Sequence, residues 1–171
     1  MELSVKDKFA VVLNQTFENV GVIIDELHKK GKTDLSAGIV AALQKYVGSL
    51  DKDYNIKSFI ENSYNFWDDI HRKDEKCMVG NSSIIFGEHA KKPEFSSVRS
   101  IFTAEMDDEA KDFMWKCLHS LVRLSIRYVF EGRGGTVTRA DGKIKISYKN
   151  KAFFEQVDIP KYNKMWELKL W

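Results

Sequence analysis

Hydrophobic residues in the N-terminal third of the chain recur at intervals of three and four, the spacing of one face of an α-helix. The longest such stripe predicts a helix over residues 4–30, with Ser4 at the N-cap position. Shorter stripes predict helices over residues 34–47 and 54–73. The short connection between the first two helices predicts that they lie antiparallel, side by side.

The segment after the third helix has a weaker pattern. Residues 74–79 either extend that helix by a turn or form a short helix of their own. Residues 80–96 are rich in Gly, Asn and Ser and predict a long, mostly irregular connection. A second strong stripe then predicts a helix over residues 107–131, which starts with three acidic residues, as helix N-termini favour.

The period changes to that of a strand after this helix. Two alternating segments flank Asp141-Gly142 and predict a β-hairpin over residues 136–149, with isoleucines on one face of its second strand and lysines on the other. The tail, residues 151–171, combines aromatic and charged residues. It is either a final helix or an extended arm.

Together these elements predict a mainly α protein, a bundle of four to five helices with a C-terminal β-hairpin. The length of 171 residues fits one domain over residues 1–171, and 43% hydrophobic and 12% aromatic residues exclude a disordered chain. No apolar run approaches the roughly 18–20 residues of a membrane span, and the first residues lack the pattern of a signal peptide. We therefore expect an intracellular protein without a membrane span, not a secreted one.

Catalytic and metal-binding patterns are missing from the sequence. Cys77 and Cys117 are too few for a disulfide framework or a multi-thiolate zinc site. Glu88-His89, together with His71 or Cys77, comes nearest to a metal site but lacks the spacing of structural zinc ligands. The sequence contains no nucleophile elbow, no phosphate loop and no His-Glu-x-x-His motif. We expect no metal, no cofactor and no enzymatic activity.

Charge is distributed unevenly along the chain. Residues 1–110 carry 14 basic and 19 acidic side chains, whereas residues 111–171 carry 13 basic and 6 acidic ones. The basic C-terminal part could bind nucleic acid, with Arg123, Arg127 and Arg139 as candidate phosphate-binding residues. The alternative is that the two oppositely charged parts attract each other within one fold.

The hairpin and the tail carry candidate partner-binding residues. These are the lysines of the second strand and the tryptophans of the tail: Lys143, Lys145, Trp166 and Trp171. Aromatic residues of this kind are enriched at the centres of protein interfaces. The alternative is that the tryptophans fold back onto the helices of the same chain.

Two segments carry a resemblance to a known group of proteins. Ile70–Val79 resembles a charged segment that ends in Lys-Asp-Glu and is followed by two bulky apolar residues. Ala110–Leu121 resembles a helix with the sequence Ile-Trp-Lys-Tyr-Leu, although Met114 and Cys117 stand where Ile and Tyr are more usual. This pair is similar to small helical proteins of nucleocytoplasmic large DNA viruses, over about residues 55–130. No catalytic residues come with the resemblance.

These observations favour a non-enzymatic structural or interaction protein. The resemblance implies a viral protein, located in the infected-cell cytoplasm or in the virion as a capsid-associated or assembly component. Its partner would be another protein or a second copy of itself. The alternative function is that of a nucleic-acid-binding accessory protein that uses the basic C-terminal part.

Overall fold

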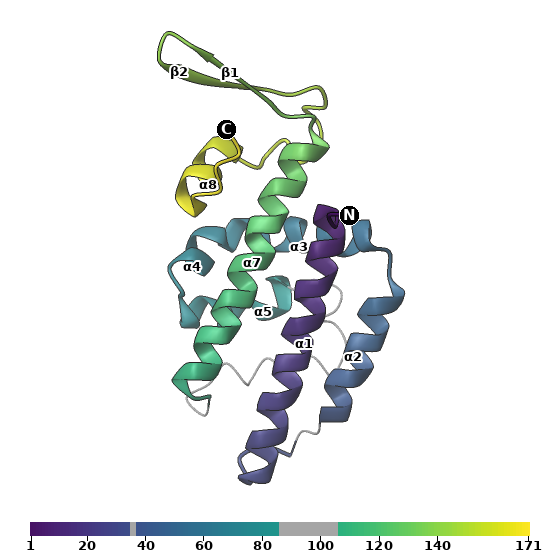
Figure 1. The fold of residues 1–171 in the computed structure, drawn as a ribbon. Coiled ribbons are helices and arrows are strands. Elements are labelled where there is room, and N and C mark those ends of the chain that lie inside the picture. The colour runs from purple at the N-terminus through teal and green to yellow at the C-terminus, as the bar shows by residue number, and fades with distance from the viewer. Residues whose placement is uncertain (35–36, 86–105) are drawn as a thin grey trace.

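Three helices run along the length of the molecule. The computed structural model describes residues 1–34, 37–85 and 106–171, most of which are helical. These three helices are α1 (Val5–Lys29) and α7 (Asp108–Gly132), with 25 residues each, and the shorter α2 (Ala37–Ser49), with 13. α1 runs antiparallel to α2 on one side and to α7 on the other (Figure 1). The mainly helical character and the antiparallel pairing of the first two helices are as the sequence predicts.

α1 and α7 begin where the sequence places their caps. The Oγ atom of Ser4 accepts a hydrogen bond from the backbone N–H of Asp7, and Asp107 Oδ1 accepts one from the N–H of Ala110. Their apolar stripes are buried against each other and against α2 and α3. The predicted helices over 4–30 and 107–131 are therefore confirmed to within two residues at each end.

None of the described helices combines the length and the apolar composition needed to cross a membrane.

The prediction of one continuous helix over residues 54–73 is wrong. The segment is divided into α3 (Lys52–Ser63), the 3₁₀ turn η1 (Tyr64–Phe66) and α4 (Trp67–His71). A 3₁₀ turn has three residues per turn instead of 3.6, so it rotates the positions that follow it relative to a continuous helix. Trp67 directly follows this turn and is fully buried, and its indole N–H donates a 2.9 Å hydrogen bond to Ser63 Oγ.

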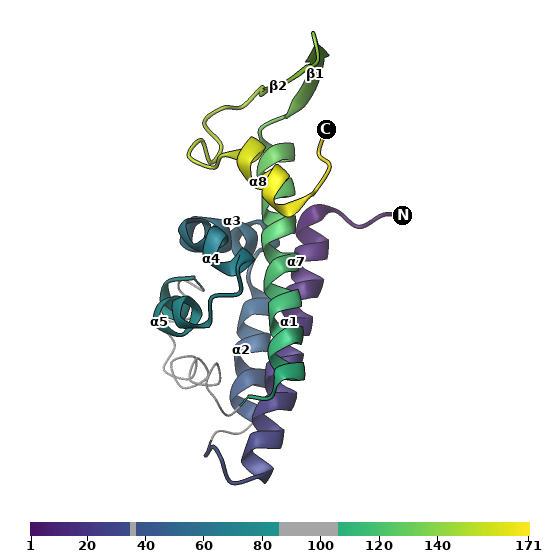
Figure 2. The same ribbon diagram turned by 90° about the vertical axis from the view of Figure 1, so that its left-hand side faces the viewer.

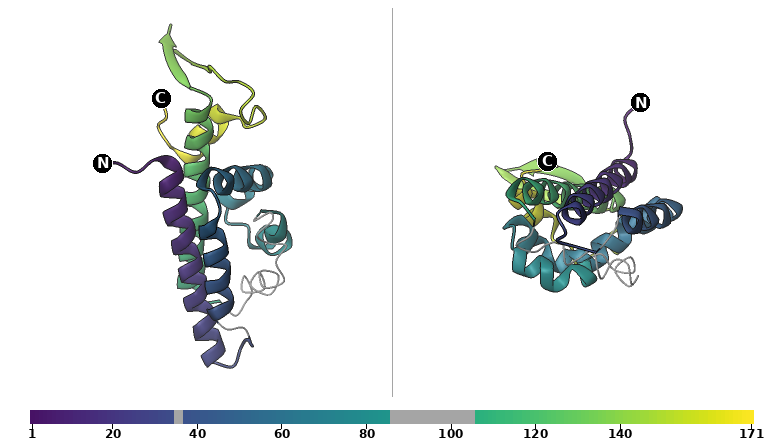
Figure 3. Two further views of the ribbon diagram at one scale, coloured as in Figure 1. Left: turned by 90° about the vertical axis from the view of Figure 1, so that its right-hand side faces the viewer. Right: turned by 90° about the horizontal axis from the view of Figure 1, so that it is seen from below.

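A separate helix, α5 (Glu75–Ile85), follows α4. Asp74 Oδ1 caps it by accepting a hydrogen bond from the N–H of Cys77. Of the two alternatives for residues 74–79, the separate helix is therefore confirmed. The predicted irregular connection is wrong over residues 80–85, and its remainder, like residues 35 and 36, lies outside the described residues. α3, α4 and α5 cover one side of the layer formed by α1, α2 and α7 (Figures 2 and 3).

The predicted hairpin is confirmed. It consists of β1 (Thr136–Ala140) and β2 (Lys143–Ser147), which pair antiparallel with Ala140 opposite Lys143. Asp141 and Gly142 both have positive φ angles, 52° and 71°, as a two-residue type I′ turn requires. The hairpin extends beyond the C-terminal end of α7, away from the helical body (Figure 1).

The tail contains a helix rather than an extended arm. α8 (Ile159–Trp166) starts at Asp158, whose Oδ1 accepts a hydrogen bond from the N–H of Lys161. Pro160 stands in the first turn, where its missing N–H costs nothing. α8 packs beside the C-terminal half of α7 (Figures 1 and 2).

Candidate functional site

The hairpin is exposed along most of its length. On β1 only Val137 is half-buried, and on β2 only Ile146 is. Ile144 is 49% exposed although it is apolar. In the described part of the chain the sheet has two strands, so each strand has one edge without a ladder partner. Such edges are templates for pairing with another chain.

The register divides the side chains of the hairpin into two faces, because residues opposite each other in an antiparallel pair point to the same side. The apolar face consists of the pairs Val137–Ile146 and Arg139–Ile144. The lysine face consists of the pairs Thr136–Ser147, Thr138–Lys145 and Ala140–Lys143. The predicted separation of isoleucines from lysines is confirmed, and Arg139 stands on the apolar face.

Arg133 fixes the base of the hairpin. It is only 4% exposed, and its Nε and Nη1 atoms donate hydrogen bonds of 2.6 and 3.2 Å to the carbonyl oxygens of Phe153 and Val157. Its guanidinium also lies 5.1 Å from the ring centroid of Tyr148, which directly follows β2. One buried cation therefore ties the start of the hairpin to the segment after it.

The glycines beside Arg133 allow close packing. A Cβ atom on Gly132 would lie 2.5 Å from the ring of Phe153, and one on Gly135 would lie 2.5 Å from the ring of Phe130. Both distances are too short for a real contact. The joint between α7 and β1 is therefore a packed connection, and these glycines are the signal in the sequence that it is closely packed.

Two of the three candidate phosphate-binding residues line one groove between α1 and α7. Arg123 and Arg127 stand one turn apart on α7, and Lys8 of α1 lines the same groove, which has a volume of about 480 Å³. Arg139 is instead on the hairpin. Most of the remaining groove lining is apolar: Leu3, Val11, Val12, Leu124 and Leu168.

Carboxylates offset much of the positive charge in this groove. Lys8 Nζ lies 2.7 Å from a carboxylate oxygen of Glu2, and an Nη atom of Arg127 lies 3.4 Å from one of Glu131. Two of the three basic side chains that line the groove are therefore already paired. The groove combines an apolar floor with a modest positive charge.

No protein-family model, curated protein or solved structure matches this chain.

The tail tryptophans differ in their surroundings. Trp166 is 3% exposed, and its ring packs edge-on against those of His71 and His119, with both centroid distances 4.9 Å. A side chain buried in this way is not offered to a partner, so the prediction of Trp166 as a partner-binding residue is wrong and its alternative, folding back, holds. Trp171 is half-buried at the end of the chain, whereas Lys143 and Lys145 are exposed.

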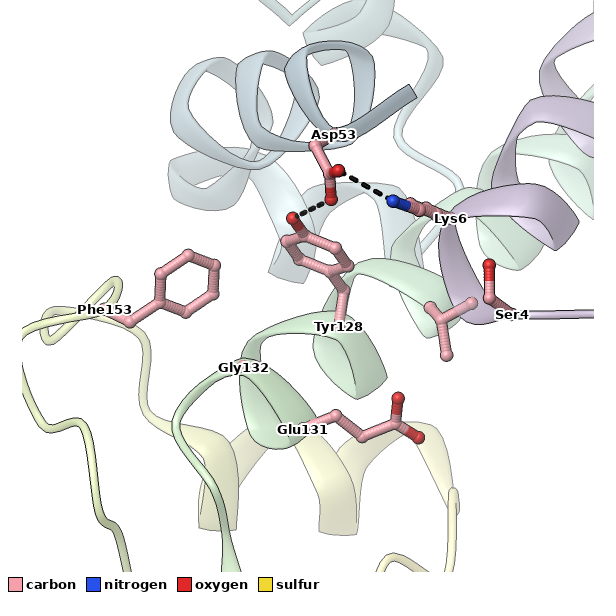
Figure 4. A pocket seen from close by; sticks show the side chains of 8 residues that line it. Ser4, Lys6, Asp53, Tyr128, Glu131, Gly132 and Phe153 are labelled. Carbon is pink, nitrogen blue, oxygen red and sulfur yellow. Dashed lines mark hydrogen bonds and ion pairs between the residues drawn. The ribbon is translucent and has the colours of Figure 1, made fainter. Parts of the chain in front are cut away.

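A second, smaller pocket contains a half-buried polar cluster. The hydroxyl of Tyr128 donates a 2.6 Å hydrogen bond to Asp53 Oδ1, and Lys6 Nζ donates one of 2.9 Å to Asp53 Oδ2 (Figure 4). Burial and the neighbouring Asp53 carboxylate raise the pKa of Tyr128. The hydrogen bonds from Tyr128 and Lys6 lower the pKa of Asp53. These directions hold the phenol protonated and the carboxylate ionised, which suits a link between α1, α3 and α7 better than proton transfer.

The thiols and histidines form no metal centre in the part of the chain that the structure describes, where no group of three or more His, Cys, Asp or Glu side chains could hold an ion. Glu88 and His89 lie outside that part. Burial raises the pKa of the Cys77 and Cys117 thiols, which lowers their reactivity because the thiolate is the reactive form.

Proposed function

We propose that this protein is a non-enzymatic interaction protein that binds other protein chains through its C-terminal hairpin. The observation that supports this proposal is an exposed two-stranded hairpin that is fixed at its base by Arg133 and the packed glycines. A two-stranded ribbon is at best marginally stable by itself. A strand from a partner would add hydrogen bonds along an edge and cover apolar side chains that are now exposed.

Strand addition suits the chemistry of this surface. Main-chain hydrogen bonds supply affinity in this binding mode, and alternate side chains supply specificity. The hairpin offers both, since its edges are unpaired in the described structure and Ile144 and Val137 stand on one face. Arg133 and the packed glycines fix the orientation of the hairpin before a partner binds, which reduces the entropy lost on binding.

The resemblance to proteins of large DNA viruses extends this proposal to the place where the protein acts, an infected cell and the virus particle. The protein would be made in the cytoplasm of an infected cell and would serve as an assembly component of the virion. Quantitative mass spectrometry of purified particles and of infected-cell cytoplasm tests this extension. Enrichment in particles would support it, and confinement to the cytoplasm would contradict the virion part.

Site-specific photo-crosslinking tests the role of the hairpin. A photoreactive phenylalanine analogue replaces Ile144 in one variant and Val22, which is 57% exposed on α1, in the matched control. We expect the hairpin position to crosslink one defined protein strand, identified by sequencing the crosslinked peptide, and the α1 position to give no such product. Equal crosslinking from both positions would contradict the proposal.

Binding of nucleic acid through the groove is the second candidate function. The observation that favours it is the presence of Lys8, Arg123 and Arg127 in one groove. Contacts with phosphates would make affinity fall steeply with salt, without base specificity. Replacing both groove arginines with Glu should then abolish binding to single- and double-stranded oligonucleotides, and the same change at Lys143 and Lys145 should not. No binding by the unaltered protein at low salt would remove this candidate.

A further inference from the structure

We infer that the hairpin binds a second copy of itself through the outer edge of β1, so that two hairpins form one four-stranded antiparallel sheet. This inference rests on the function proposed above, because it names the partner of the same surface. It follows from the register of the hairpin and from the positions of its charges.

The turn determines which backbone groups point outward. Ala140 and Lys143 flank a two-residue turn, so they form a hydrogen-bonded pair. Hydrogen-bonded and non-hydrogen-bonded pairs alternate along an antiparallel ladder. The outward N–H and C=O groups therefore belong to Val137 and Arg139 on β1 and to Ile144 and Ile146 on β2.

An antiparallel pair of β1 strands centred on Thr138 satisfies these groups. Val137 then stands opposite the partner's Arg139, and each such pair exchanges two backbone hydrogen bonds. Thr138 stands opposite the partner's Thr138 in a non-hydrogen-bonded pair, where side chains come closest. Threonine pairs at such positions are favourable. No like charges face each other directly in this arrangement.

The same arrangement at the edge of β2 is unfavourable. Its centre is Lys145, the middle residue of Lys143–Ser147, so Lys145 would stand directly opposite the partner's Lys145. Like charges at opposing positions destabilise a sheet, and edge lysines are a common protection against unwanted pairing. Pairing at the β2 edge therefore places like charges directly opposite each other, and pairing at the β1 edge, which has threonine at its centre, does not.

The pairing also extends the apolar face. Across the four strands, Ile146 and Val137 of one copy would continue into the partner's Arg139 and the partner's Ile144. This row brings together apolar side chains that each hairpin alone leaves partly exposed. Strands of five residues bury little area, so we expect a weak, reversible dimer rather than a permanent one.

Proline substitution separates the two edges. Arg139→Pro removes an outward N–H of β1, and Ile144→Pro, at the residue directly opposite, removes an outward N–H of β2. Neither N–H takes part in the hairpin's own ladder. In sedimentation equilibrium we expect Arg139→Pro to raise the dimer dissociation constant by about tenfold or more and Ile144→Pro to leave it nearly unchanged. Loss of dimer in Ile144→Pro alone, or a monomeric unaltered protein at millimolar concentration, would overturn the inference.

A cysteine pair covers the case in which proline unfolds the hairpin. Thr138→Cys places two thiols opposite each other in the proposed dimer, at a Cα separation of about 4.5 Å that a disulfide can bridge. Lys145→Cys, on the same face of the other strand, is the matched control. Under mild oxidation we expect a covalent dimer from Thr138→Cys and little from Lys145→Cys or from the unaltered chain. Equal yields from both variants would overturn the inference.

The two proposals can fail separately. If the unaltered protein is monomeric but Ile144 still crosslinks a strand of a different protein, the hairpin is an interaction surface and its partner is not a second copy. If the dimer forms and Thr138→Cys links it, both proposals stand. If neither pairing nor crosslinking occurs, both fail.

Discussion

His119 lies at the centre of an aromatic cluster between α4, α7 and α8. Its Nε2–H donates a 2.8 Å hydrogen bond to the carbonyl oxygen of Ile70, and its ring packs against that of Trp166. Burial lowers the pKa of His119 below the usual 6.5, and the neighbouring charges of Arg123, Lys73 and His71 lower it further, although the hydrogen bond to the carbonyl opposes them. The neutral ring is therefore part of what holds α8 on the helical body.

A dependence of stability on pH follows from this lowered pKa. The unfolded chain binds a proton at His119 near pH 6.5, whereas the folded chain binds it only at lower pH. The stability that the neutral His119 ring contributes is therefore fully present above about pH 6.5 and is lost as the pH falls below that value. Urea unfolding at about pH 7.5 and about pH 5.5 should show a smaller loss of stability in His119→Gln than in the unaltered protein.

His28, exposed at the end of α1, provides the matched substitution for this experiment. His28→Gln should keep the pH dependence of the unaltered protein. Asp7 does not interfere, because its pKa is near 3.8 in the unfolded chain and is lowered to about 2 in the folded chain by Lys52 and Ser4, so both values lie below the pH range of the experiment. An unchanged pH dependence in His119→Gln would show that the cluster does not sense this proton.

A second prediction for a single residue concerns Arg133. Arg133→Met would leave the carbonyl oxygens of Phe153 and Val157 without their donors, so we expect the free energy of unfolding to fall by about 2–3 kcal/mol. Arg139→Met, on the exposed hairpin, should change it by less than about 0.5 kcal/mol. Chemical denaturation of both variants measures the difference. Equal stabilities would mean that Arg133 does not hold the base of the hairpin.

At the scale of elements, patterns in the sequence predicted those helices and strands whose formation depends on neighbouring residues in the chain. The long helices and the hairpin follow from periodicity, caps and the Asp141-Gly142 turn. The break after Ser63 does not, because it accompanies the burial of Trp67, whose ring packs edge-on against Tyr162 of the distant α8. Burial of Trp166 likewise depends on histidines from other elements. Sequence could place the two faces of the hairpin but not the contacts that fix its base.

The packed joint between α7 and β1 gives a prediction at this scale. Gly132→Ala would drive a methyl group into the ring of Phe153, so we expect a loss of about 1–3 kcal/mol of stability. Gly48→Ala is the matched control, because a Cβ there meets nothing within 4 Å and alanine favours a helix by up to about 1 kcal/mol. The midpoint temperature of thermal unfolding should therefore fall in Gly132→Ala and rise in Gly48→Ala. A stabilised Gly132→Ala would show that Phe153 can move aside.

The whole molecule consists of an elongated helical body with a basic hairpin at one end (Figure 1). Two such hairpins repel each other through Arg139, Lys143 and Lys145, although the register keeps like charges from facing directly. Added salt screens this repulsion. Self-association should therefore strengthen between low and physiological salt, whereas binding of nucleic acid would weaken. Sedimentation and oligonucleotide titration over the same salt series distinguish the two, and dimerisation that weakens with salt would contradict the pairing of β1 edges.

The position of α1 between α2 and α7 has a consequence for synthesis of the chain. α2 follows α1 directly, but α7 begins about 100 residues after α1 does. At about 5–20 residues per second, a ribosome takes roughly 5–20 seconds to add that length. During this time the apolar side chains of α1 that will pack against α7 are not yet covered by that helix. The nascent chain thus exposes an apolar stripe for seconds, and we expect it to bind a ribosome-associated chaperone until α7 emerges.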